Sequence, residues 1–139
     1  MKKLTIPLQR TVEIKRGGES ATFTLYPLPL GYHAYLERVY PPPVEYVGNG
    51  VKNEPRALQN AAYEHNYLTM LCMIAKSLRD QVDTQPPTSE KRADWDAYAK
   101  ALKAEYSEAG LIEGDLMLLR KSMEQVNQGI VGKEEPPSA

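Results

Sequence analysis

Residues 11–26 read TVEIKRGGESATFTLY, and this stretch decides how the chain begins to fold. The consecutive glycines Gly17-Gly18 accept the positive φ angles of a tight turn without steric cost, so they predict a β-hairpin. Apolar and polar residues alternate on both sides of the turn, which lets one face of each strand be buried while the other meets water. The alternating apolar residues before the turn are Leu4, Ile6, Leu8, Val12 and Ile14. The predicted hairpin therefore covers residues 3–28.

An aromatic segment punctuated by prolines follows the hairpin. Pro27 and Pro29 end the second strand, and the residues after them predict a short helix over 31–39. Its apolar side comprises Tyr32, Tyr35, Leu36 and Val39. Three consecutive prolines from Pro41 stop this helix, because proline lacks the amide donor and clashes with the preceding turn. Residues 41–55 then predict a loop, whose length suits either mobility or a binding role.

Three longer segments with helical periodicity come next, over about residues 56–80, 90–108 and 111–128. The first is apolar on two sides, which is typical of a helix at the centre of a fold. The third has apolar residues in alternating steps of four and three, a narrow seam suited to packing against another helix. The seam comprises Ile112, Leu116, Leu119, Met123 and Val126. Its pattern fits either the core of this chain or a contact with a second copy.

These patterns predict an α+β fold, with an N-terminal β-hairpin followed by a mostly helical bundle of about four helices. We expect a single domain over residues 1–128, made of the hairpin at 3–28 and a helical part at 31–128. The polar, proline-bearing residues 129–139 predict a disordered tail. The predicted core comprises Val12, Ile14, Phe23, Leu25, Leu68, Leu71, Ile74, Trp95, Leu102, Leu116 and Leu119.

Composition excludes several classes of function. The 139 residues carry a formal net charge of −1 and lack a long basic cluster, so we expect no nucleic-acid partner. No run approaches the roughly 20 apolar residues of a membrane span, and charge returns at Arg10 before a signal peptide could form. The single cysteine, Cys72, fits a reducing compartment. We therefore expect a soluble, cytoplasmic protein with no membrane partner.

No set of residues predicts a catalytic, cofactor-binding or metal site, so we expect no enzyme and no cofactor. His33 and His65 are the only histidines, and neither has a second histidine four residues away or a cysteine pair beside it. We assign both a structural or surface role. Cys72 is surrounded by apolar residues, which is typical of an inert core thiol. The glycines at 17–18 and 48–50 match no phosphate-binding pattern and indicate turns.

Tyrosines are the most suggestive functional residues. The chain has 9 tyrosines against one Phe and one Trp, and five of them fall between Tyr26 and Tyr46. Tyrosine combines a large contact area with a polar tip and few rotamers, which suits protein interfaces. They could equally be half-buried aromatics that hold the loop to the domain. The candidate protein-binding residues are Tyr32, Tyr35, Tyr40 and Tyr46, together with Leu116, Leu119 and Met123 of the helical seam.

The layout resembles the tail assembly chaperones of long-tailed bacteriophages. The similarity lies in the size of the chain, the hairpin TVEIKRGGESATFTLYPLPL, the immediate short helix GYHAYLERVY and the all-helical remainder, over most of residues 3–128. Many of these families also have a longer form made by a −1 ribosomal frameshift near the end of the short form. Val131-Gly132-Lys133 permits a common slippery heptamer at that place.

The resemblance implies a function for the chain. Such a chaperone binds and solubilises the long, helical tape measure protein in the host cell cytoplasm during tail assembly. The tail tube protein then displaces it, and it is absent from the mature virion. The resemblance supplies no catalytic residues. The alternative is a small structural virion protein of the tail or neck, which would use the hairpin to extend a neighbour's sheet.

Overall fold

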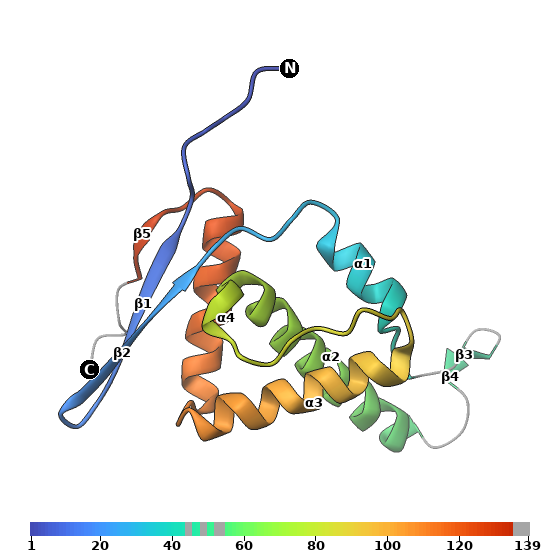
Figure 1. The fold of residues 1–139 in the computed structure, drawn as a ribbon. Coiled ribbons are helices and arrows are strands. Elements are labelled where there is room, and N and C mark those ends of the chain that lie inside the picture. Colours follow the sequence, from blue (N-terminus) through green and yellow to red (C-terminus); the bar gives the residue numbers. More distant parts are fainter. Residues whose placement is uncertain (44–45, 48–49, 52–54, 135–139) are drawn as a thin grey trace.

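The computed structural model describes residues 1–43, 46–47, 50–51 and 55–134. Its architecture is α+β, as predicted, with the N-terminal hairpin at one side of a helical bundle (Figure 1). In chain order the elements are β1 (Arg10–Arg16), β2 (Glu19–Leu25), α1 (Tyr32–Val39), β3 (Tyr46–Val47), β4 (Gly50–Val51), α2 (Pro55–Leu78), a 3₁₀ turn (Arg79–Gln81), α3 (Arg92–Glu108), α4 (Glu113–Asn127) and β5 (Gly132–Lys133).

The hairpin turns at the predicted glycines but is shorter than predicted. β1 and β2 pair antiparallel from Arg10 opposite Leu25 to the pair that flanks the turn, and Gly17 has a φ of 58°. The prediction that residues 3–9 belong to the hairpin is wrong. In this register residue 8 would face Pro27, which has no amide donor to extend the ladder. Residues 1–9 instead leave the body of the molecule (Figure 1).

The end of the chain adds a strand to the hairpin. β5 pairs in parallel with the start of β1, so the sheet has the order β2-β1-β5. The amide of Glu134 donates to the carbonyl of Thr11 at 2.8 Å, and the Glu134 side chain is buried. The predicted disorder of the tail is therefore wrong for residues 129–134. Glu134 forms a buried ion pair with Arg10, which the polar composition of this segment does not indicate. Residues 135–139 lie outside the described residues.

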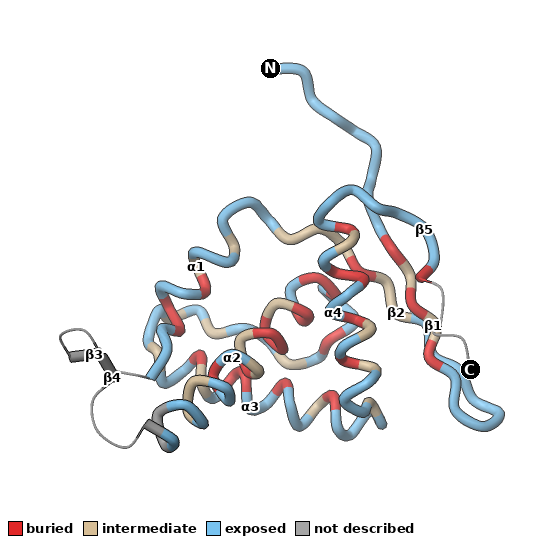
Figure 2. The backbone as a smooth tube through the Cα atoms, turned by 180° about the vertical axis from the view of Figure 1, so that it is seen from behind, coloured by how far each residue is buried: buried red, intermediate tan, exposed pale blue. Residues whose placement is uncertain are grey.

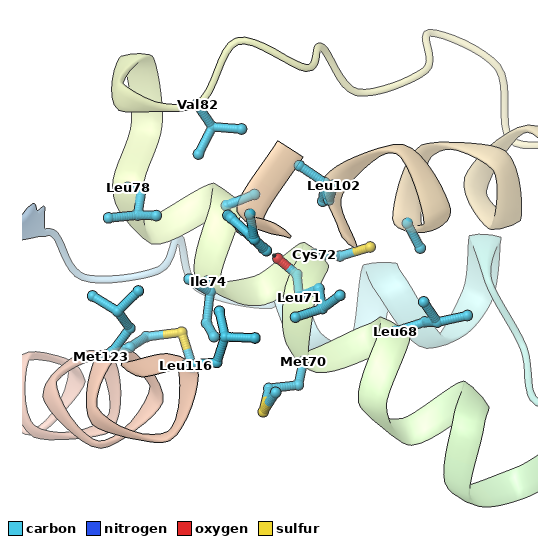
Figure 3. Close-up of a cluster of buried hydrophobic side chains, with 14 of the residues drawn as sticks. Leu68, Met70, Leu71, Cys72, Ile74, Leu78, Val82, Leu102, Leu116 and Met123 are labelled. Carbon is cyan, nitrogen blue, oxygen red and sulfur yellow. Dashed lines mark hydrogen bonds between the residues drawn. The ribbon is translucent and has the colours of Figure 1, made fainter. Parts of the chain in front are cut away.

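Helix α2 is central, as its two apolar sides predicted. It packs against α3, α4 and β2, and its C-terminal half is buried around Leu71 and Ile74 (Figure 3). The predicted short helix is α1, and the two later helices are α3 and α4. Within the predicted loop at 41–55, β3 and β4 form a small antiparallel pair, and α2 begins at Pro55. None of the helices in the described ranges is long and apolar enough to cross a membrane.

The core lies between the helices and one face of the sheet (Figure 2). All the predicted core residues are buried except Phe23, which is partly buried. Leu25 near the base of the hairpin is fully covered, whereas Ala21 nearer the tip is exposed. Phe23 lies between these two residues on the same face, so the helices cover it only in part.

Candidate protein-binding site

A row of aromatic side chains runs from α1 to α3. Tyr32 and Tyr35 of α1 stack with ring centroids 6.2 Å apart. The edge-to-face contact of Tyr35 with Trp95 of α3 has a centroid distance of 5.9 Å, and Tyr98 continues the row 5.5 Å from Trp95. Distances and tilts of this kind are those that aromatic pairs favour. The structure thus brings together two of the predicted binding residues, Tyr32 and Tyr35, with two aromatics of a distant helix.

An open groove of about 400 Å³ lies along this row. Prolines from two loops complete its walls, and Leu30 at its edge is fully exposed. The lining residues are Pro29, Leu30, Gly31, Tyr32, Tyr35, Lys76, Pro86, Pro87, Trp95 and Tyr98. A groove with aromatic and proline walls and a few polar groups suits an apolar segment of another protein.

Local sequence features position this groove. Gly31 has a φ of 81°, a left-handed conformation that turns the chain from the prolines into α1. The amide of Tyr32 donates to the carbonyl of Pro29 at 3.1 Å, which fixes the loop that carries Leu30. On the opposite wall, Nε1 of Trp95 donates to the carbonyl of Ser89 at 3.0 Å and holds the indole ring in place.

The groove is neutral apart from one lysine. Burial raises the pKa of Tyr32 and of Tyr98 above the ordinary value of 10, so both hydroxyls stay protonated at neutral pH. Nζ of Lys76 lies 5.5 Å from the centre of the Tyr32 ring, within the range of a cation–π contact. An apolar segment with a carboxylate near Lys76 fits this environment best.

Tyr40 does not belong to this surface, which corrects its predicted binding role. Its side chain is buried, and its hydroxyl donates to Oδ1 of Asp96 at 2.6 Å. Its ring meets His65 edge-to-face at 4.5 Å, and the Arg92 guanidinium lies 5.1 Å from its centre. Tyr40 therefore joins α1 to α2 and α3. Tyr46 lies in β3, but its side chain is outside what the structure describes.

The seam of α4 is inside the molecule. Leu116, Leu119 and Met123 are buried against the other helices and the sheet, so they cannot contact a second protein while the chain is folded. This burial settles the choice between core and external contact in favour of the core, and corrects their predicted binding role. Ile112, at the start of the seam, is exposed.

The histidines and the cysteine differ in their surroundings. His33 is exposed beside Glu37, with 3.6 Å between Nε2 and the carboxylate. His65 is buried, and burial, with the nearby Arg92 charge, lowers its pKa. Burial raises the pKa of the Cys72 thiol to about 12. In the part of the chain that the structure describes, no group of three His, Cys, Asp or Glu side chains could hold a metal ion.

One exposed segment, residues 1–9, lies outside the predicted site, and we call it the N-terminal arm. The whole segment is exposed (Figure 2). Leu4 and Ile6 have exposed fractions of 89% and 83%, and Leu8 is also exposed. Their alternation by itself predicts a strand of the hairpin. The position of Pro27 opposite residue 8 was the signal that separates the arm from the paired strand.

No known protein family, no curated protein and no solved structure matches this chain.

Proposed function

We propose that the protein is a phage tail assembly chaperone that binds and solubilises the tape measure protein in the host cytoplasm. The aromatic groove between α1 and α3 is the observation that supports this proposal best. The partly exposed rings of Tyr32 and Tyr35, above the buried Trp95, offer apolar area with limited loss of rotamer freedom. The apolar stripe of a long helical protein has the chemistry that such a groove accepts.

The size of the groove suits reversible binding to the tape measure protein. About 400 Å³ accommodates only a few side chains, so each copy would bind with modest affinity. Several copies along one long protein would still keep it soluble, because their contributions add along the chain. The tail tube protein could then displace them one by one. On this proposal the chaperone is absent from the mature virion.

Co-expression with the tape measure protein tests the proposal. We expect the wild-type chain to keep the tape measure protein in the soluble fraction after centrifugation. Leu30→Asp should return most of it to the pellet, because a charge would replace the exposed leucine at the edge of the groove. Tyr63→Asp is the matched control, since Tyr63 is exposed on α2 and does not line the groove. Equal precipitation with and without the wild-type chain would refute the proposal.

A structural virion protein of the tail or neck is the second candidate. The outer side of β2 supports it, because among the described strands β2 pairs only with β1 and could accept a strand from a neighbouring subunit. Mass spectrometry of purified virions separates the two candidates. Presence at a fixed stoichiometry would favour the structural protein, whereas absence would favour the chaperone.

A further inference from the structure

The outer edge of β2 is open over the half of the strand nearest the turn. The side chain of Gln81 closes the edge at Thr24: its Oε1 accepts from the Thr24 amide at 2.8 Å, and its Nε2 donates to the Thr24 carbonyl at 2.6 Å. Backbone groups of residues two apart point to the same side of a strand. Those of Thr22 and Ser20 therefore also point away from β1, and both residues are exposed.

This edge has little protection against pairing. Natural proteins usually block a free edge with lysine, proline or a covering segment. β2 reads ESATFTL and contains neither a lysine nor a proline, and Gln81 covers only one residue. The edge can therefore accept a further strand.

The N-terminal arm has the properties of such a strand. It leaves the body in an extended path (Figure 2). Its apolar residues Leu4, Ile6 and Leu8 share one parity and are exposed, Leu8 the least of the three. Pro7 has no amide hydrogen, so its side of the backbone must face away from an acceptor strand. The backbone groups of the three apolar residues then face the acceptor.

The direction of pairing follows from where the apolar side chains would lie. In an antiparallel arrangement Ile6 would stand opposite Thr22 and share its polar face. In a parallel arrangement Ile6 stands opposite Ala21, whose side chain lies on the face that also carries Phe23. Ala21 is exposed and Phe23 only partly buried, so the parallel arrangement covers apolar surface that the helices leave open.

Charge favours the same direction. In the parallel arrangement the start of the arm lies at the start of β2, which places Lys2 and Lys3 near Glu19. All three side chains are exposed, and none forms an ion pair with another described residue. The antiparallel arrangement would carry both lysines to the other end of the strand.

The arm cannot reach this edge in its own chain. Arg10 already lies in β1, on the opposite side of β2. The outer position is therefore two strand spacings from β1, about 10 Å. Leu8 and Arg10 are two residues apart and can be at most about 7 Å from each other. We propose that the N-terminal arm of one copy pairs in parallel with the outer edge of β2 on a second copy.

A cross-linking experiment on the full chain tests this arrangement. Two preparations with different tags carry Ile6→Cys and Ala21→Cys, are mixed and are oxidised. Opposed residues in neighbouring strands are close enough for a disulfide, and the native Cys72 is buried. We expect a mixed disulfide-linked dimer. Thr22→Cys in place of Ala21→Cys should link far less, because its side chain points to the other face. Equal or stronger linking through Thr22→Cys, or no linking above that of Glu108→Cys, would overturn the proposal.

The oligomeric state gives a second, independent test. Light scattering should show the wild-type chain associating as its concentration rises. Thr22→Pro should weaken the association about tenfold, because it removes one outward amide donor of the edge. This amide does not serve the β1 pairing, so the thermal unfolding curve of the diluted protein should change little. A wild-type chain that stays monomeric at millimolar concentration would overturn the proposal. The test does not depend on the proposed chaperone function.

Discussion

Arg10 and Glu134 form a buried ion pair although 124 positions separate them in the chain. Nε and Nη2 of Arg10 both donate to Oε2 of Glu134, at 2.9 and 2.5 Å. Lys121 lies 3.0 Å from the other carboxylate oxygen, and Ser122 donates to Oε2 at 3.3 Å. This cluster fastens the end of the chain to β1 and α4.

Loss of the Glu134 carboxylate should destabilise the fold. Glu134→Ala leaves the Arg10 guanidinium buried without its counter-charge, and we expect the free energy of unfolding to fall by about 3 kcal/mol. Urea unfolding followed by Trp95 fluorescence measures this change. Glu124→Ala is the matched control, because the pair of Glu124 with Arg120 is exposed, and it should cost less than about 0.5 kcal/mol. Equal effects of the two substitutions would contradict the structural role of Glu134.

Stability should fall in acid because of this cluster. Burial by itself would raise the pKa of Glu134, but hydrogen bonds from Arg10 and Lys121 outweigh it and hold the pKa below the ordinary value of 4.5. The unfolded chain therefore binds this proton first, so the stabilisation is complete above about pH 4.5 and is lost as the pH falls through the lower folded value. Interactions similarly lower the pKa of Asp96, chiefly hydrogen bonds from Lys100 and Tyr40.

The contribution of Glu134 to the loss of stability in acid can be measured separately. Unfolding free energies of the wild type and Glu134→Gln should be compared between pH 6 and pH 3. We expect the variant to be less stable at pH 6 but to lose less stability on acidification, because it has no carboxylate to protonate at this site. Parallel pH profiles would mean that Glu134 has the same pKa in the folded and unfolded chains.

The hydroxyl of Tyr40 should contribute to stability rather than to binding. Tyr40→Phe removes the hydrogen bond to Asp96 and should lower the free energy of unfolding by about 1.5 kcal/mol. Tyr63→Phe provides the comparison. Tyr63 is exposed, so loss of its hydroxyl should leave the free energy of unfolding nearly unchanged. Denaturant unfolding reports both values. A neutral Tyr40→Phe that instead weakens partner binding would restore the interface role predicted from sequence.

The α4 seam should behave as core. Leu119 is fully buried, so Leu119→Ala should cost about 3 kcal/mol of unfolding free energy through lost burial and a new cavity. Ile112 lies on the same seam but is exposed, and Ile112→Ala should cost less than about 0.5 kcal/mol. Thermal or urea unfolding of the two variants gives the contrast. A nearly neutral Leu119→Ala would contradict the packing of α4 against the core.

The sequence predicted the elements whose signals are local. Gly17 specifies the turn because glycine readily adopts its positive φ, and the apolar spacing of α2 specifies a helix buried on two sides. The same alternation rule failed at Leu4 and Ile6. Alternation describes a strand that could be half-buried, but it does not say whether a partner strand is long enough to pair with it.

The candidate site was only half visible in the sequence. Tyr32 and Tyr35 stood out because tyrosines are concentrated near them. Trp95 and Tyr98 are three residues apart, a spacing that places them on one face of a helix but does not indicate that they would meet α1. Tyr40 lies in the same tyrosine-rich stretch as Tyr32 and Tyr35. Its side chain is nevertheless buried, and its hydroxyl donates to Asp96. Composition carries no information about which aromatic faces the core.

The sequence by itself determined the α+β class, the turn, the helices and part of the buried apolar core, because these depend on propensities and spacings of neighbouring residues. The tertiary structure alone decided three features: the aromatic groove, the free edge of β2 with its exposed arm, and the burial of Glu134 on Arg10. The groove and the ion pair join residues far apart in the chain, and the edge of β2 is free because no other described strand pairs with it. Their free energy depends on distances and burial that exist only once the helices and the sheet have packed together.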